Sequence, residues 1–235
     1  MRWLPWGRTA APTLSAEQRQ RLAALPVPLG SSQQPLNRQR FVVLDLETSG
    51  LNTQRDRVLS IGAWVIEDGA IDLGQQFECT LCHLDQPVNA SVLIHGLAPS
   101  TLAAGREPVA ALLDCLAFLG DSPLLAFHAP FDQRMLGRAV DQQLGQRLAS
   151  EFLDIAELAP LLNPQVVLRN AGLDDWTAHF GLRAQQRHSA SADALVTAEL
   201  ALILFHQARR QGLDSLDALQ RRLAQWRRRQ HSPAF

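Results

Sequence analysis

The sequence is poor in cysteine, contains no lysine and has no long apolar run. Its three cysteines, Cys79, Cys82 and Cys115, are too few and too odd in number for a disulfide framework, as expected in a reducing compartment. No apolar stretch approaches the roughly 18 residues of a membrane span, and the first residues lack a continuous apolar segment ahead of a small-residue cleavage site. These absences argue against a membrane protein and a secreted one, and we expect a cytoplasmic protein.

Cys79, Cys82 and His83 spell the attachment pattern of c-type haem, which strand geometry argues against. The segment 70–84 has the composition of a β-strand, and residues three apart in a regular strand point to opposite faces. A structural zinc site would need a second pair of cysteines or histidines at suitable spacing, and the sequence has none. We therefore expect no haem and no zinc, and we interpret the cysteines as packing residues.

All positive side-chain charge comes from arginine, and much of it lies near the two ends of the chain. Residues 1–40 carry a net charge of +5 and residues 206–235 another +5, so the middle carries −11 within the total of −1. Basic ends attract a polyanion, whereas an acidic middle repels one unless cations neutralise it. This pattern is typical of a metal site that acts on a polyanion, but solvated arginines on tails and ordinary surface acids explain it equally well.

Changes in the residue pattern along the sequence divide the chain into three segments. Residues 1–40 form an N-terminal extension and linker with one short helix, in which Ser15 and Gln18 have capping-box spacing. Residues 41–210 have the alternating strands and helices of a folded domain, and residues 211–235 combine an amphipathic helix with a basic tail. We expect this last helix to dock on its own domain through Leu216, Leu219, Leu223 and Trp226.

The domain contains five predicted strands, two of which are joined by a turn-like Asp68-Gly69 pair. Helical periodicity separates the later strands. Strands that alternate with helices indicate an α/β fold, in which helices cover the faces of a mixed five-stranded sheet. The predicted strands cover residues 41–47, 57–66, 70–84, 123–127 and 151–155.

The first predicted strand, FVVLDLE, is apolar on both faces until it ends in acidic residues. Side chains alternate along a strand, so Asp45 and Glu47 share one face with Phe41 and Val43. Two carboxylates at the carboxyl end of a buried strand repel each other unless a cation lies between them. Hard divalent ions such as Mg²⁺ or Mn²⁺ prefer such oxygen ligands. The pair alone is equally compatible with two solvent-exposed acids at the end of a strand.

Two further acids lie on apolar helix stripes. In LLAFHAPFDQRML a short strand leads into a helix, and Asp132 lies in the first turn, where the helix dipole favours negative charge. In RHSASADALVTAEL, Ser189 or Ser191 can cap a long helix, and Asp193 lies about one turn inside it. Both acids share a stripe with apolar residues, so we expect both to face the core side of their helices.

His188 precedes the second of these helices; taken alone it is more typical of a packed or surface histidine than of a catalytic base. Together with the four acids, however, it resembles the three exonuclease motifs of the DnaQ-like (DEDDh) family, whose bacterial member is the proofreading epsilon subunit of DNA polymerase III. The resemblance covers about residues 41–205 and includes the segment IHGLAPSTL. It implies an RNase H-like version of the mixed sheet flanked by helices. It also implies hydrolysis of phosphodiester bonds from a 3′ end, with release of 5′-mononucleotides.

The resemblance implies a role for each matching residue. Two divalent ions, Mg²⁺ or Mn²⁺, would be held by carboxylates, and His188 would take the proton of the attacking water. The resemblance implies that Phe131 packs near a base of the substrate. A core position is the alternative, and we favour it. The implied metal ligands are Asp45, Glu47, Asp132 and Asp193, and the implied substrate contacts are Thr48, Ser49, Gly50, His95, His128 and Phe131.

One departure from the family pattern lies in its second motif. The family commonly has a His-Asn pair before the Phe-Asp pair, whereas this sequence has Phe127 and His128 in those places. The predicted ligand Asp132 is intact. The departure therefore bears on substrate positioning or on hydrogen bonds at the start of the helix.

The resemblance favours single-stranded DNA as the substrate. Two alternative functions stay open: an exoribonuclease that trims RNA 3′ ends, and a polymerase-associated subunit that binds rather than cleaves. The forty-residue leader and short tail differ from those expected of a proofreading subunit, so we expect an exonuclease that acts outside the core replicase. The last residues, QHSPAF, loosely match the clamp-binding pattern of replication proteins. Contact with a polymerase or a clamp is therefore a further hypothesis.

Overall fold

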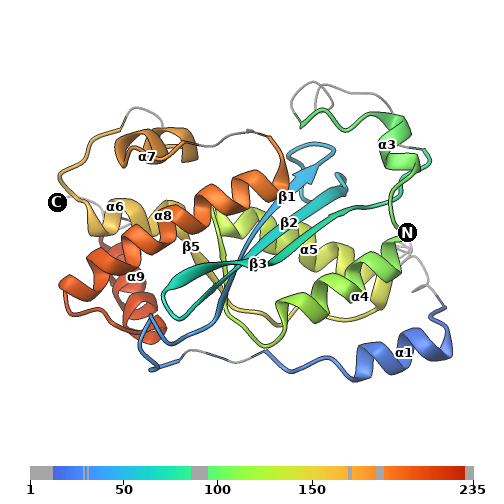
Figure 1. The fold of residues 1–235 in the computed structure, drawn as a ribbon, viewed down its shortest axis with the longest axis horizontal. Coiled ribbons are helices and arrows are strands. Elements are labelled where there is room, and N and C mark those ends of the chain that lie inside the picture. The colour runs from blue at the N-terminus through green and yellow to red at the C-terminus, as the bar shows by residue number, and fades with distance from the viewer. Residues whose placement is uncertain are drawn as a thin grey trace, which may run out of the picture.

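The strand β1 (Phe41–Thr48) lies at the centre of a five-stranded sheet with the order β3-β2-β1-β4-β5 (Figure 1). The computed structural model describes residues 13–28, 30, 32–85, 95–168, 171–183 and 188–230. Antiparallel pairing joins β1 to β2 (Val58–Glu67) and β2 to β3 (Ala70–Thr80), whereas β4 (Leu124–Ala126) and β5 (Phe152–Asp154) run parallel to β1. The predicted mixed five-stranded α/β sheet is confirmed.

Helices cover both faces of this sheet. One apolar core lies between the sheet and α4 (Pro108–Leu119) and α5 (Ala129–Leu144), and a second core lies between the sheet and α6 to α9. The helices of the second core are α6 (Ile155–Leu162), α7 (Leu173–His179), α8 (Ala190–Arg210) and α9 (Leu216–Gln230). The other described helices are α1 (Ala16–Ala23) and α3 (Pro99–Ala103).

The alternation of β1 decides which core each of its side chains enters. Val42 and Leu44 pack in the core formed by α4 and α5. Phe41 and Val43 pack in the core that contains α8, where the ring of Phe41 lies 4.9 Å from that of Phe205. Because side chains alternate along a strand, the carboxylates that follow Val43 at every second position lie on the α8 side of the sheet.

The strand boundaries depart from the sequence prediction mainly at β3. It ends at Thr80, four residues before the predicted end, so the argument that Cys82 lies on the opposite face of a regular strand was wrong. Cys79 is buried inside β3, whereas Cys82 lies beyond the strand and contacts the carbonyl of Ala103 through its sulfur. The predicted turn at Asp68-Gly69 is confirmed, with φ values of 50° and 74° at these two residues.

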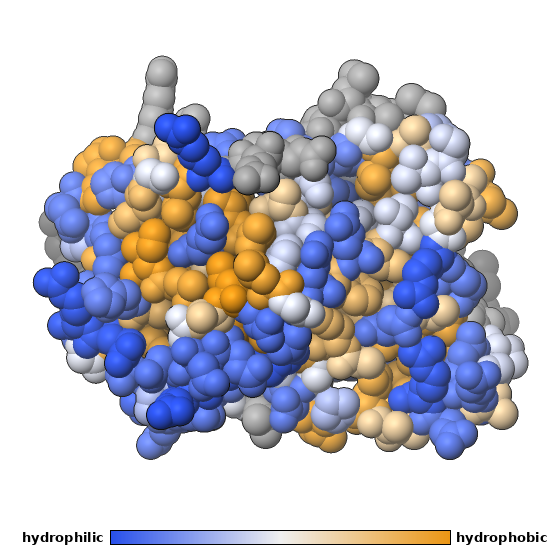
Figure 2. All heavy atoms as spheres, in the orientation of Figure 1, coloured by the Kyte–Doolittle hydropathy of each residue, from blue (hydrophilic) through white to orange (hydrophobic). Residues whose placement is uncertain are grey.

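The helices outside the central domain also follow their sequence signals. Ser15 and Gln18 form the predicted capping box of α1, and Arg21 of this helix forms an ion pair with Asp114 of α4. In α9 the side chains of Leu216, Leu219 and Leu223 are buried in the same apolar core as residues of the sheet, and Trp226 is half-buried, so this amphipathic helix packs on the fold. Figure 2 shows mostly hydrophilic side chains at the lower left of the molecule, where the end of α8 and the start of α9 lie in Figure 1. No helix in the described part of the chain is long and apolar enough to span a bilayer.

Candidate active site

Three carboxylates meet at the carboxyl end of β1. Asp45 and Glu47 extend from the strand, and Asp193 extends from the first turn of α8. Each offers an oxygen, and these oxygens all lie within 4.8 Å of one another. Asp45 and Glu47 are half-buried and Asp193 is buried, so water screens their mutual repulsion only in part. A hard divalent cation fits this set of oxygen donors and would remove the repulsion.

Gly62 of β2 allows α8 to approach the sheet closely enough to bring Asp193 into this cluster. Gly62 pairs with Asp45 in the β1–β2 ladder, and a Cβ atom placed on it would lie 2.1 Å from the backbone nitrogen of Ser191. Only glycine fits such an approach between two backbones. The sequence reasoning missed this residue, although a glycine inside an otherwise apolar strand is a recognised signal of close backbone contact.

Two side chains of the sheet also hold the start of α8. The indole nitrogen of Trp64 donates a hydrogen bond to the carbonyl of Ser191 at 2.9 Å, and the amide of Gln76 donates one to its hydroxyl at 2.7 Å. Of the two predicted cap residues, Ser189 is the N-cap, although its side chain makes no capping hydrogen bond, and Ser191 lies inside the helix. The hydroxyl of Ser191 is used to attach α8 to β3 instead.

Asp132 lies in the first turn of α5, three residues after the first residue of a helix that begins slightly earlier than predicted. Its side chain is buried, with 4% of its surface exposed, although it is not a member of the three-carboxylate group. Burial raises the pKa of its carboxyl well above the usual value, and the negative charges of Asp154 and Glu47 raise this pKa further. A neighbouring cation would stabilise the ionised form of such a buried acid.

The raised pKa of Asp132 predicts how the metal-free protein responds to pH. A buried carboxyl group with a raised pKa stabilises the fold below its unfolded pKa, and this contribution is lost as the pH rises through its folded pKa. We expect Asp132→Asn to raise the midpoint of thermal unfolding of chelator-treated protein, and to do so more at pH 8 than at pH 5. Equal midpoints for both proteins at the two pH values would contradict this expectation.

Asp154 joins the starts of α5 and α6 and was not identified from the sequence. Its Oδ1 atom accepts hydrogen bonds from the backbone nitrogens of His128 and Ala156, both at 3.0 Å. Burial raises the pKa of this carboxyl group. Because the first bond holds the residue before α5, Asp154 helps to fix the helix that carries Asp132. The sequence signal that could have identified Asp154 is its position, since an acid between a strand end and a helix start is a typical N-cap.

His128 occupies the position of the family departure and adopts a left-handed backbone conformation, with φ 65° and ψ 43°. Its side chain is exposed and makes no capping hydrogen bond, but its ring lies edge-on to that of Phe127, with the ring centroids 4.8 Å apart. Asparagine and histidine both tolerate this region, whereas a β-branched residue does not.

We therefore expect His128→Asn to leave the free energy of unfolding unchanged or slightly raised, because asparagine favours the same conformation. His128→Val should lower it by about 1–2 kcal/mol. Chemical denaturation of the two variants beside the wild type measures the difference. Equal stability of all three proteins would show that the left-handed conformation carries no cost here.

His188 lies directly before α8, where its backbone places it near the carboxylates. It has a positive φ of 63° and an exposed side chain, and its backbone nitrogen donates to Oδ2 of Asp193 at 3.3 Å. An exposed imidazole is accessible to a water molecule. A role for His188 as the proton acceptor beside the cluster stays a prediction.

The turn after β1 is held by its own hydroxyl groups. Thr48 donates to the carbonyl of Gly50 at 2.8 Å, and the hydroxyl of Ser49 donates to Asp56 and accepts from the backbone nitrogen of Arg57. A Cβ atom on Gly50 would lie 2.5 Å from the Asp56 carboxylate, so glycine serves close packing here. The adjacent Leu51, which the sequence reasoning did not single out, is 87% exposed beyond this turn.

The other two predicted substrate contacts lie in different surroundings. His95 is half-buried, its Nδ1 atom accepts a hydrogen bond from the backbone nitrogen of Leu97, and burial lowers the pKa of its imidazole. Its Nε2 atom is buried without a hydrogen-bond partner among the described residues. Phe131 is partly buried against the core of α4 and α5, in agreement with the favoured core position.

Comparison with known proteins relates the chain to exonucleases. A model of the RNase_T family, described as Exonuclease, matches residues 42–201. The chain is 30% identical over 181 residues to a DNA polymerase III PolC-type protein of Thermotoga maritima, covering 77% of this chain and 13% of that protein. It is 29% identical over 192 residues to a DNA polymerase III subunit epsilon-like protein of Rhodobacter capsulatus, covering 80% of this chain and 27% of that protein. The chain thus spans a small part of these relatives.

Solved structures show the same fold at low sequence identity. E. coli Exonuclease I in complex with an oligonucleotide aligns with a TM-score of 0.64 and 19% identity, over 74% of this chain and 42% of that one. Exonuclease X in complex with 5′ overhanging duplex DNA aligns with a TM-score of 0.60 and 19% identity, over 76% of this chain and 99% of that one. These alignments bear out the RNase H-like arrangement of the sheet.

Proposed function

Because this chain belongs to the RNase_T exonuclease family, we propose that it hydrolyses phosphodiester bonds from the 3′ end of single-stranded DNA and releases 5′-mononucleotides. The observation that carries the proposal is the group formed by Asp45, Glu47 and Asp193, whose oxygens lie within 4.8 Å of one another. They lie at the end of the central strand with Asp132 buried in the first turn of α5. Like charges held this closely favour a site for divalent cations.

In this proposal Asp45, Glu47, Asp132 and Asp193 hold two ions of Mg²⁺ or Mn²⁺. Such ions acidify a bound water and neutralise charge on the leaving oxygen of a phosphodiester. His188 accepts the proton of the attacking water, since its exposed imidazole borders the helix that carries Asp193. Gly62 and Asp154 position α8 and α5, which carry two of the ligands.

The choice of DNA as substrate is supported by what the similar proteins are called. Relatives are named DNA polymerase III PolC-type and DNA polymerase III subunit epsilon-like protein, and one solved neighbour is described in complex with 5′ overhanging duplex DNA. The same set of metal ligands would also suit hydrolysis of RNA, so trimming of RNA 3′ ends is the alternative activity. The names of the relatives also favour a polymerase partner, which copurification with a polymerase catalytic subunit would reveal. The predicted clamp-binding residues at the end of the chain lie outside the described residues, except Gln230.

Matched strands test direction and substrate together. We expect a 5′-labelled single-stranded DNA to shorten progressively in Mg²⁺, whereas the same strand with a chemically blocked 3′ end stays intact. A matched RNA strand should be degraded more slowly. Equal cleavage of the blocked strand would exclude an exonuclease that starts at the 3′ end, and faster cleavage of RNA would favour the trimming function.

A further inference from the structure

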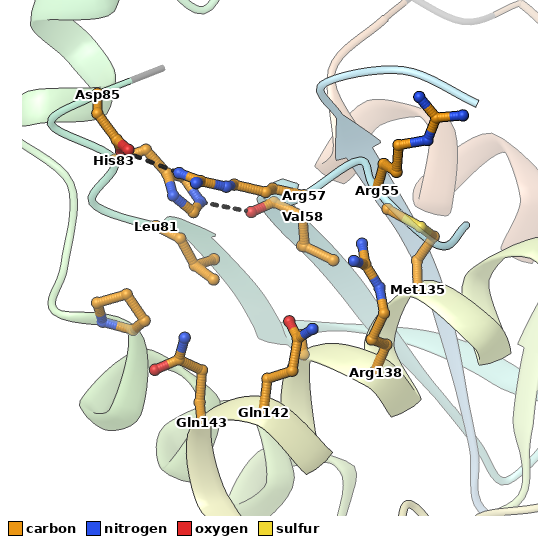
Figure 3. Close-up of a pocket in the computed structure, with 12 residues that line it drawn as sticks. Arg55, Arg57, Val58, Leu81, His83, Asp85, Met135, Arg138, Gln142 and Gln143 are labelled. Atoms are coloured by element: carbon orange, nitrogen blue, oxygen red, sulfur yellow. Dashed lines mark hydrogen bonds and ion pairs between the residues drawn. The ribbon is translucent and has the colours of Figure 1, made fainter. Parts of the chain in front are cut away.

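An arginine-lined groove lies at the loop between β1 and β2, on the α4–α5 side of the sheet. It has a volume of about 640 Å³ and is formed by the loop before β2, the segment after β3 and α5 (Figure 3). Arg55, Arg57 and Arg138 line it, together with one carboxylate, that of Asp85. The groove thus holds an excess of positive charge, although residues 41–205 together carry a net charge of −11. This local excess is what attracts an anion to an otherwise acidic domain.

The arginines of the groove are only partly neutralised by the protein. Arg57 forms an ion pair with Asp85 at 2.9 Å, whereas Arg55 and Arg138 form no ion pair within 4.0 Å among the described residues. Arg138 donates one hydrogen bond to the carbonyl of Gln54 at 3.0 Å, while its buried Nε atom has no hydrogen-bond partner in the described chain. In Figure 3 Arg138 extends from α5 toward the loop that carries Arg55.

The surroundings of Arg138 favour the binding of an anion. Burial lowers the pKa of its guanidinium group, Asp56 opposes this shift, and the positive charge of Arg57 adds to it. Guanidinium groups that are partly desolvated and close to one another are stabilised when a phosphate accepts their hydrogen bonds.

The groove is connected to the carboxylate cluster through two elements. The backbone nitrogen of Ser49, in the turn after Glu47, donates to the carbonyl of Arg57 at 2.9 Å. On α5, Arg138 lies six residues after Asp132, which corresponds to a rise of about 9 Å along the helix. At about 3.4 Å per nucleotide of a stacked strand, this distance corresponds to roughly two to three phosphates.

We propose that this groove binds the backbone phosphates of the polynucleotide strand whose 3′ end lies at Asp45 and Glu47. The proposal rests on the proposed nuclease function and names how the same site holds its substrate. Guanidinium groups contact phosphates irrespective of base or sugar, so the groove should hold DNA and RNA strands alike and contribute length-dependent affinity.

A salt titration of strand binding tests the groove without any hydrolysis. Full-length protein in chelator is titrated into fluorescent single strands of about twelve nucleotides, one of DNA and one of RNA, and anisotropy gives the dissociation constant. The double variant Arg55→Gln/Arg57→Gln should reduce the slope of log affinity against log salt by about 1.4, since each lost phosphate contact removes about 0.7. Arg55→Lys/Arg57→Lys, which keeps both charges, should retain most of the slope.

The matched control removes two positive charges from α9, which does not line the groove. Arg222 and Arg229 are exposed on α9, and Arg222→Gln/Arg229→Gln should leave the slope for both strands unchanged. An equal loss of slope in this control would show that only the total charge matters and would overturn the proposal. An unchanged slope in the groove variant would overturn it as well.

Kinetics with short and long substrates separates the groove from the chemistry. For the twelve-nucleotide strand we expect the Arg55→Gln/Arg57→Gln variant to raise KM about tenfold with kcat little changed, whereas cleavage of a dinucleotide should be unaffected. Equal losses on both substrates would contradict a phosphate-binding groove. If the wild type cleaves nothing, the proposed nuclease function fails, and the salt titration still decides whether the groove binds the strand.

Discussion

Asp45→Asn is expected to lower kcat for degradation of an end-labelled single-stranded DNA by a factor of at least about 10²–10³. The substitution preserves the shape of the side chain but removes one negative charge from the group that also contains Glu47 and Asp193. An amide oxygen is a weaker ligand for a hard cation than a carboxylate, and a displaced ion no longer stabilises the charge that develops on the phosphate. Gel analysis of the labelled strand at saturating Mg²⁺ gives the rate.

The matched control for this prediction is Asp141→Asn, which removes one charge from an exposed position of α5. This variant should degrade the strand at the wild-type rate. Circular dichroism checks that both variants are folded. A folded Asp45→Asn protein that degrades the strand as fast as the control would exclude the carboxylate cluster as the active site.

Gly62→Ala is expected to reduce both activity and stability, although Gly62 carries no functional group. The added Cβ atom would lie 2.1 Å from the nitrogen of Ser191 and 2.2 Å from the carbonyl carbon of Ala190, so the start of α8 must move. Asp193 lies in the first turn of this helix and must move with it. Overpacking of this kind costs about 1–3 kcal/mol, and a displacement of about 1 Å at a catalytic group can reduce the rate about a hundredfold.

Gly137→Ala provides the control for Gly62→Ala. Its Cβ atom would meet only the Cβ of Leu148 at 3.8 Å, an ordinary contact, and alanine is the better helix residue within α5. This variant should be more stable than the wild type by about 0.5–1 kcal/mol and fully active. Chemical denaturation and the strand-degradation assay measure both effects. Wild-type activity of Gly62→Ala would show that the position of Asp193 does not depend on this contact.

The parts of the site that could be predicted from the sequence depend on local periodicity. Alternation along FVVLDLE places Asp45 and Glu47 on one face because a strand side chain points the same way at every second residue. The apolar stripes of two helices likewise indicated that Asp132 and Asp193 face inward, and both are buried in the structure. These inferences need no knowledge of which elements meet.

The parts that could not be predicted depend on contacts between distant segments. The approach of Gly62 to Ser191 joins β2 to α8, and the hydrogen bond from His128 to Asp154 joins the start of α5 to the end of β5. Ser191 was one of two residues predicted to cap its own helix, but Gln76 of β3 donates to its hydroxyl instead. Local sequence signals name the caps and turns that a residue can form, while the tertiary fold selects among them.

The arginine groove illustrates the same limit for charge. The sequence shows basic ends and an acidic middle, and this average hides the three arginines that line one groove at the loop between β1 and β2. Arg55 and Arg57 lie in one loop, but Arg138 joins them only because α5 packs beside that loop. Net charge along the chain therefore failed to indicate the surface that we propose for the substrate.

Restoration of metal to chelator-treated protein tests the proposed activity most directly. The protein is incubated with 5′-labelled single-stranded DNA in EDTA, and Mg²⁺ is then added in excess. We expect the strand to remain intact in EDTA and to shorten from its 3′ end into a ladder of labelled fragments once Mg²⁺ is present. Degradation that continues in EDTA, or an intact strand after addition of Mg²⁺ and then Mn²⁺, would contradict a metal-dependent 3′-to-5′ exonuclease.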